Sequence, residues 1–136
     1  MDLYKSMAAS AAGMKAQGAR LKVISENLAN ANTTAETPGD LPYRRKTITF
    51  ANELDRKLGI STVKVAKVGV DKSDFERRYD PSHPSADADG YVLLPNVNTL
   101  VEAMDMREAQ RTYEANLSAI DTARQMLSRT LELLRT

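Results

Sequence analysis

The sequence contains no cysteine and no tryptophan, and it has one histidine and two phenylalanines among 136 residues. Without cysteine there is no disulfide, no thiolate nucleophile and no cysteine-based zinc site. His83 alone cannot form a multi-histidine metal site. Because large aromatic side chains are scarce, a core must come from Leu, Ile, Val, Met and Ala, which suits packed stripes on helices.

The sequence also has little excess charge, since 19 basic and 18 acidic residues leave a formal net charge of +1. Domains that bind nucleic acid are usually strongly basic, so we expect no nucleic-acid partner. No stretch approaches the roughly 20 apolar residues that span a bilayer, so we expect no direct membrane insertion. Polar residues interrupt every apolar run near the N-terminus, which argues against a cleaved secretory signal.

Apolar residues at heptad spacing predict a helix over residues 2–32. One line consists of Met7, Met14, Leu21 and Leu28, and the interleaved line includes Leu3, Ile24 and Ala31. A further line of small residues consists of Ala8, Ala12, Ala16, Ala19 and Val23. The helix therefore has two faces to bury.

The same spacing predicts a longer helix over residues 97–135, with Asn98 as its N-cap. Its heptad positions are Met106, Tyr113, Ile120, Leu127 and Leu134, together with Ala103, Leu117 and Leu131. We expect the two terminal helices to form an antiparallel coiled-coil pair. A second apolar stripe on each helix then stays exposed unless other helices cover it, so the sequence predicts self-association or a partner.

The composition changes between the helices, where Pro38, Gly39 and Pro42 stop helix continuation. Residues 45–50 and 60–70 are rich in β-branched side chains and predict strands, with two to four strands expected in all. Residues 51–59 are expected to form a short helix that ends at Gly59. Residues 80–91 are expected to form a long ordered loop.

The predicted fold is therefore mainly α with a small β/loop module. We divide the chain into an N-terminal helix of the coiled-coil core (1–32), a β/loop-rich middle region (33–96) and a C-terminal helix of the core (97–136).

Two short patterns resemble a calcium-binding loop and a hydrolytic triad, but each lacks residues that such a site requires. Ser85, Asp87 and Asp89 resemble the start of a calcium loop, but the first ligand position is a serine and the twelfth, Asn96, is not the required glutamate. We expect a hydrogen-bonded turn there instead. His83 has a neighbouring serine, but the sequence shows no nucleophile elbow, so a hydrolytic triad is not expected.

We therefore predict no catalytic residue, no cofactor and no metal site. An enzyme that uses the loop of Asp87 and Asp89 is the weaker alternative, because no acid and base pair accompanies it.

The candidate functional residues are those that would mediate packing. Asparagine amides offer two donors and one acceptor, so at a crowded helix end they can satisfy backbone groups where water is scarce. The basic cluster of Arg44, Arg45 and Lys46 is a candidate for contact with an acidic neighbour. The predicted helix-seam and interface residues are Met14, Leu21, Ile24, Asn27, Leu28, Asn30, Met106, Tyr113, Asn116, Leu117, Ile120, Leu127 and Leu131.

Four segments together resemble the proximal rod proteins of the flagellar basal body, within the flagellar rod and hook family. These segments are SENLANANTT (25–34), PGDLPYRRK (38–46), YDPSHPSADADGYVLLPNVN (79–98) and DMREAQRTYEAN (105–116). Asp40 and Ser85 depart from the family pattern, in which glycine and aspartate are common at these positions. The departures leave the geometry of the two loops open.

The resemblance implies a structural subunit of the bacterial flagellar rod, which assembles helically through its terminal helices into the drive shaft that transmits torque. It implies that the partners are copies of the chain, adjacent proximal and distal rod subunits, and the flagellar type III export apparatus. It also implies a place in the basal body within the periplasm, reached without a cleaved signal peptide. The alternative from the residues is a soluble coiled-coil adaptor that binds one partner without polymerising.

Overall fold

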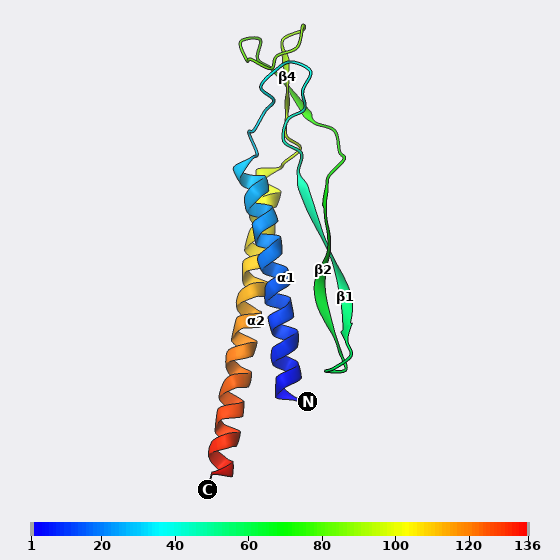
Figure 1. Ribbon diagram of the computed structural model, residues 1–136. Coiled ribbons are helices and arrows are strands. Elements are labelled where there is room, and N and C mark those ends of the chain that lie inside the picture. Colours follow the sequence, from blue (N-terminus) through cyan, green and yellow to red (C-terminus); the bar gives the residue numbers. More distant parts are fainter. Residues whose placement is uncertain (1, 136) are drawn as a thin grey trace. The chain divides into compact units, whose positions relative to one another are not determined.

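A computed structural model describes residues 2–135, which form two long helices at the ends of the chain and four strands between them (Figure 1). The elements, in chain order, are α1 (Leu3–Ala29), β1 (Lys46–Asp55), β2 (Ile60–Val70), β3 (Glu76–Tyr79), β4 (Tyr91–Leu94) and α2 (Thr99–Leu134). The prediction of two terminal helices around a small β-containing middle is confirmed.

Polar side chains define the ends of both helices close to the predicted positions. At the end of α1 the Asn30 amide donates to the Glu26 carbonyl at 2.8 Å, and the chain then turns. Before α2 the Asn98 side-chain oxygen accepts the backbone N–H of Leu100 at 3.1 Å and of Val101 at 3.3 Å. These bonds satisfy amides at the start of the helix, so the predicted N-cap is confirmed.

The four strands form two small sheets, β1 with β2 and β3 with β4. The predicted strands at 45–50 and 60–70 are confirmed, since they lie in β1 and β2. In the second sheet, β3 and β4 pair antiparallel, with Glu76 opposite Leu94 and Tyr79 opposite Tyr91. Sequence patterns did not single out this pair, because each strand has only four residues.

The predicted short helix at 51–59 is wrong, because β1 continues to Asp55 and a tight turn leads into β2. The Asp55 carboxylate accepts the backbone N–H of Lys57 at 2.9 Å and of Leu58 at 3.2 Å. Gly59 closes the turn with φ of +67°, a left-handed conformation that favours glycine. A helix of about nine residues is marginal without tertiary packing, and the side-chain hydrogen bonds of Asp55 stabilise the turn instead.

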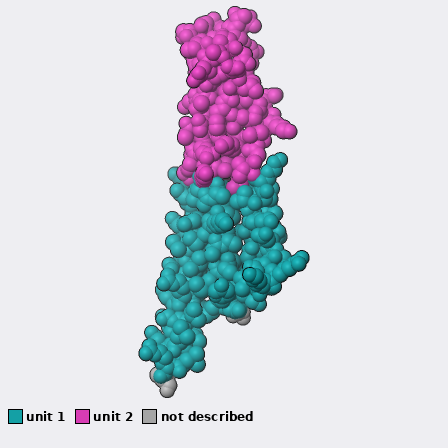
Figure 2. Space-filling model, in the orientation of Figure 1, with its two compact units in different colours: residues 1–21, 49–67, 107–136 teal, residues 22–48, 68–106 magenta. Residues whose placement is uncertain are grey.

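The chain forms two compact units, which Figure 2 colours separately. Unit 1 comprises residues 1–21, 49–67 and 107–136, and unit 2 comprises residues 22–48 and 68–106. The buried apolar side chains are Ala16, Ala109 and Ala123 in unit 1, and Val23, Ile24 and Val92 in unit 2. Among the described residues, neither helix combines the length and apolar character needed to cross a membrane.

In unit 1 the two helices contact each other through a glycine. A methyl group added at Gly13 of α1 would lie 2.9 Å from the side-chain nitrogen of Asn116 in α2. The Asn116 amide is itself held by a 3.0 Å bond to the carbonyl of Thr112. About two turns further along α1, and two turns back along α2, Arg20 lies 3.5 Å from the Glu108 carboxylate. The absence of a side chain at Gly13 therefore makes room for Asn116.

We predict that Gly13→Ala destabilises the protein while Gly18→Ala does not. Alanine is the better helix former by about 1 kcal/mol, and the added methyl at Gly18 meets no described atom within 4 Å outside its own helix. At Gly13 the methyl overlaps Asn116, and overpacking of this kind costs about 1–3 kcal/mol. Urea unfolding followed by circular dichroism should rank Gly18→Ala above wild type and Gly13→Ala below it.

The double variant Gly13→Ala with Asn116→Ala removes the overlap and should recover most of the lost stability. A Gly13→Ala protein as stable as Gly18→Ala would contradict the contact.

Candidate functional site

Asn27 lies at the centre of a polar cluster in unit 2, with only 1% of its surface exposed. Its side-chain nitrogen donates to the Lys46 carbonyl at 2.9 Å and to the Glu102 carboxylate at 3.4 Å. Its side-chain oxygen accepts the Tyr43 hydroxyl at 2.8 Å and the Lys46 backbone N–H at 2.9 Å. One amide thus uses both donors and both acceptor sites to join α1, the start of β1 and α2. Burial raises the pKa of Tyr43, so its hydroxyl stays protonated and donates.

Glu102 is the buried charge of this cluster and is likewise 1% exposed. Arg45 donates from Nε to the Glu102 carboxylate, and its Nη1 lies 3.5 Å from the Asp71 carboxylate. Burial opposes the charge of Arg45, but the hydrogen bond and charge of Glu102, with Asp71, outweigh it and raise the pKa of Arg45. The pairing with Arg45 and Asn27 makes burial of the Glu102 carboxylate tolerable.

Asn96 connects the same cluster to the segment after β2. Its side-chain oxygen accepts the Arg45 backbone N–H at 2.7 Å. Its nitrogen donates to the Asp71 carbonyl at 3.0 Å and to the Ser73 hydroxyl at 3.2 Å. Asn96 therefore joins the segment before α2 to the chain before β1 and to the segment after β2.

The basic residues predicted to contact an acidic neighbour have partners within their own chain. Arg44 donates to the Asp71 carbonyl at 2.9 Å, and its guanidinium lies 4.2 Å from the ring centroid of Phe75. Lys46 makes a 2.9 Å ion pair with Glu26. The hydrogen bond of this pair lowers the pKa of Glu26 and raises that of Lys46.

We call this group the Asn27 cluster, which consists of Glu26, Asn27, Tyr43, Arg44, Arg45, Lys46, Asp71, Asn96 and Glu102. Sequence reasoning singled out Asn27 and the three basic residues but missed Glu26, Tyr43, Asp71, Asn96 and Glu102. A signal existed for Glu102, which lies seven residues before Ala109 on a heptad line that continues to Asn116 and Ala123. An acidic residue at the first position of a heptad line of small residues indicates a polar contact between helices.

The predicted seam residues fall into three groups in the structure, buried, half-buried and exposed. Ile24 and Asn27 are buried, and the half-buried ones are Met14, Leu21, Leu28, Asn30, Met106, Tyr113, Asn116 and Ile120. The other three lie on α2 and are exposed in this chain, Leu117 by 43%, Leu127 by 43% and Leu131 by 54%. The deepest apolar positions of α2 are Ala109 and Ala123, so α2 buries small side chains and leaves large ones accessible.

The loop between β3 and β4 is an ordered turn, as predicted. One Asp87 carboxylate oxygen accepts the backbone N–H of Asp89 and of Tyr91, each at 2.9 Å. His83 braces the loop, because its Nδ1 accepts the Ser85 N–H at 3.1 Å and its Nε2 lies 3.2 Å from the Thr34 hydroxyl. Within residues 2–135, no group of three or more His, Asp or Glu side chains is placed to hold a metal ion.

We predict that Asn27→Ala destabilises the protein by about 2–3 kcal/mol, because the Tyr43 hydroxyl and two backbone groups of Lys46 lose their partner in a buried place. Asn32→Ala is the matched control, since Asn32 is exposed just beyond α1. Chemical unfolding should separate the two variants, and equal stability would show that the cluster contributes little.

We also predict that acid weakens the folded state through Glu26 and Asp71. Bonds from the Ser73 amide and hydroxyl lower the pKa of Asp71, as the Lys46 pair lowers that of Glu26. A carboxylate with a depressed pKa stabilises the folded state above its unfolded pKa of about 4, and this contribution is lost as the pH falls further. The free energy of unfolding should therefore decrease below about pH 5, and less steeply in the Glu26→Gln, Asp71→Asn double variant. Parallel pH profiles would contradict this assignment.

Comparison with known proteins confirms the family resemblance. The profile of the family described as "Flagella basal body rod protein" matches residues 7–35, and that of "Flagellar basal body rod FlgEFG protein C-terminal" matches residues 88–133. The flagellar basal-body rod protein FlgC of Agrobacterium fabrum is 52% identical over 123 residues, which cover 90% of this chain and 88% of the relative. The FlgC proteins of Borreliella burgdorferi and Bacillus subtilis are 39% and 38% identical and are covered to 99% each, with 99% and 98% of this chain aligned. The chain therefore belongs to the FlgC family of flagellar basal-body rod proteins.

Proposed function

We propose that this chain is a structural, non-enzymatic subunit of the flagellar basal-body rod and that it assembles through its terminal helices. The observation that carries the proposal is the row of large apolar side chains left exposed on α2, at Leu117, Leu127 and Leu131. Exposed apolar stripes of this kind mark interaction sites. Family membership identifies the assembly as the rod.

The terminal helices form the core of the subunit as an antiparallel coiled-coil pair. Two contacts in unit 1 support this pairing, because Gly13 meets Asn116 and Arg20 meets Glu108, so one residue number rises as the other falls. In unit 2 the bond between Asn27 and Glu102 joins the C-terminal part of α1 to the first turn of α2. The proposed core of the subunit consists of the helical segments 1–32 and 97–136, and the segment 33–96 forms the outer module.

The exposed stripe of α2 is the surface that contacts neighbouring subunits. On the same helix Ala109 and Ala123 are buried within the chain, while Leu117, Leu127 and Leu131 remain accessible to other subunits. When a surface binds a different surface of the next copy and the rotation does not close a ring, the product is a helical filament. A shaft built in this way transmits torque through packed helices and requires no chemical step.

The partners are copies of this chain and the adjacent proximal and distal rod proteins. We propose that the assembled protein lies in the periplasmic part of the basal body and that it arrives through the flagellar type III export apparatus without a cleaved signal peptide. The Asn27 cluster contributes by holding the start of β1 against the ends of the two helices within unit 2.

We predict that Leu131→Asp abolishes incorporation into the rod while the purified protein stays folded. Leu131 is 54% exposed, so a charge there spares the chain's own packing but places a carboxylate in the contact with the neighbour. Thr122→Asp is the matched control, because it adds the same charge at an exposed polar position about 180° away around the same helix. Motility on soft agar and co-purification with detergent-extracted basal bodies are the measurements.

Recovery of Leu131→Asp in basal bodies at the wild-type level would contradict the proposed interface. Recovery of the wild-type protein only from the soluble fraction would favour the alternative, a coiled-coil adaptor that never polymerises.

A further inference from the structure

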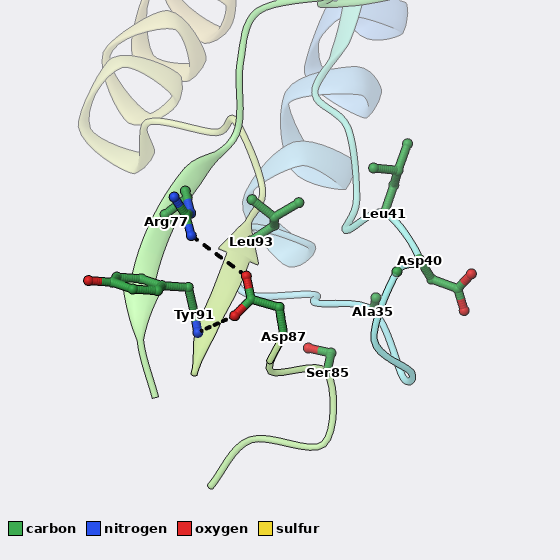
Figure 3. Close-up of a pocket in the computed structure, with 9 residues that line it drawn as sticks. Ala35, Asp40, Leu41, Arg77, Ser85, Asp87, Tyr91 and Leu93 are labelled. Atoms are coloured by element: carbon green, nitrogen blue, oxygen red, sulfur yellow. Dashed lines mark hydrogen bonds and ion pairs between the residues drawn. The ribbon is translucent and has the colours of Figure 1, made fainter. Parts of the chain in front are cut away.

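Unit 2 contains a cavity of about 200 Å³ between the segment that follows α1 and the β3–β4 hairpin (Figure 3). Its lining includes Ala35 and Leu41 from the first segment, and Tyr91 and Leu93 from β4. Pockets that bind small molecules usually measure about 300–1,000 Å³, so this cavity is small for a cofactor. Its size suits one long side chain of another protein.

The chemistry of the cavity suits an aliphatic stem with a cationic head. Leu93 is half-buried in the cavity and Leu41 is 64% exposed beside it, which provides apolar surface for methylene groups. Of the charged residues that line the cavity, Asp87 pairs with the single basic residue, Arg77, so the uncompensated charge is that of Asp40, whose carboxylate points outward from the cavity in Figure 3. Arg77 is already engaged, at 3.6 Å from the Asp87 carboxylate and 4.5 Å from the centroid of the Tyr91 ring. Lysine and arginine combine the two required properties.

The distribution of charge between the units indicates where such a side chain comes from. Unit 1 has 12 basic and 7 acidic side chains, a formal charge of +5, while unit 2 has 7 basic and 11 acidic ones, a formal charge of −4. Although the net charge of the chain is near zero, its charges are therefore unevenly distributed, with unit 1 positive and unit 2 negative. Opposite charges of this size attract unit 1 of one copy to unit 2 of another and suppress contacts between like units.

Within unit 1, the turn between β1 and β2 presents the most suitable cations. Arg56 and Lys57 are adjacent and exposed, and among residues 2–135 their side chains show no hydrogen bond or ion pair. The nearby acids are occupied, since Asp55 accepts two backbone amides of the turn and Glu53 pairs with Lys64 at 3.1 Å. The turn is narrow and is held by the bonds of Asp55, so it can present a cation to a small cavity.

We propose that the cavity between Leu41, Asp87 and Leu93 receives the Arg56–Lys57 turn of a second copy of this chain. This inference rests on the proposed rod function and specifies one of its subunit contacts. The contact is heterologous, because it joins unit 2 of one copy to unit 1 of the next, as an open helical assembly requires.

The absence of cysteine allows a direct test by disulfide cross-linking. Cells would co-express Leu41→Cys and Lys57→Cys variants from separate genes, so that a disulfide between them joins two copies. After mild oxidation of isolated basal bodies, we expect a dimer band that contains both variants and disappears on reduction. The matched control pairs Leu41→Cys with Lys67→Cys, which removes the same residue type from an exposed position in β2.

A dimer of Leu41→Cys with Lys57→Cys well above the control pair supports the contact. Equal yields, or no dimer while both variants are present in basal bodies and the cells swim, would overturn the contact but leave the rod function standing. Absence of both variants and of wild-type protein from basal bodies would instead contradict the proposed function. A cross-linker placed at residue 41 that captures only a different rod protein would overturn the choice of a second copy.

Charge reversal provides a second, independent readout. Asp40→Lys places a cation at the cavity and should reduce cross-linking on the order of tenfold, because like charges then face each other. A second copy that carries Arg56→Cys and Lys57→Glu, instead of Lys57→Cys, should restore the cross-linking yield with the Asp40→Lys copy. Failure of this pair to recover any cross-linking would show that charge complementarity does not hold the two copies together.

Discussion

The buried amide of Asn27 is the interaction on which the rest of unit 2 depends. It contacts the first turn of α2 and both backbone groups of Lys46, so it fixes the start of β1 against the two helix ends. A buried donor or acceptor that loses its partner costs more than the bond itself contributes. The geometry of α1, β1 and α2 is therefore coupled through one side chain, and Arg45, Asn96 and Asp71 extend that coupling to the segment after β2.

Small and large side chains of the helices have different environments. Close contact within the chain uses small residues, with Asn116 against Gly13 and with Ala16, Ala109 and Ala123 buried. Larger apolar residues such as Leu127 and Leu131 stay exposed on α2. A subunit that buried its largest side chains internally would have little apolar surface left, whereas this arrangement keeps that surface accessible.

Much of the fold could be predicted because its signals are local. Heptad spacing located both helices, Asn98 marked the start of α2, and β-branched residues located the long strands. The helix predicted at 51–59 was wrong because Asp55 bonds to the backbone of its own turn, a choice that helix propensity does not reveal. Asn27 was recognised from its position, but Glu102 was not, because its importance arises from contact with residues far away in the sequence.

The class of the protein, its long terminal helices, the lack of cysteine chemistry and the family all follow from composition, spacing and local motifs. Which heptad line of α2 is buried, which partners Arg44, Arg45 and Lys46 take, and how the charges divide between two compact units emerge only in three dimensions. This is because both stripes of each helix are apolar enough to be buried. Only the fit of particular side chains, such as Asn116 against Gly13, selects one of them for contact within the chain.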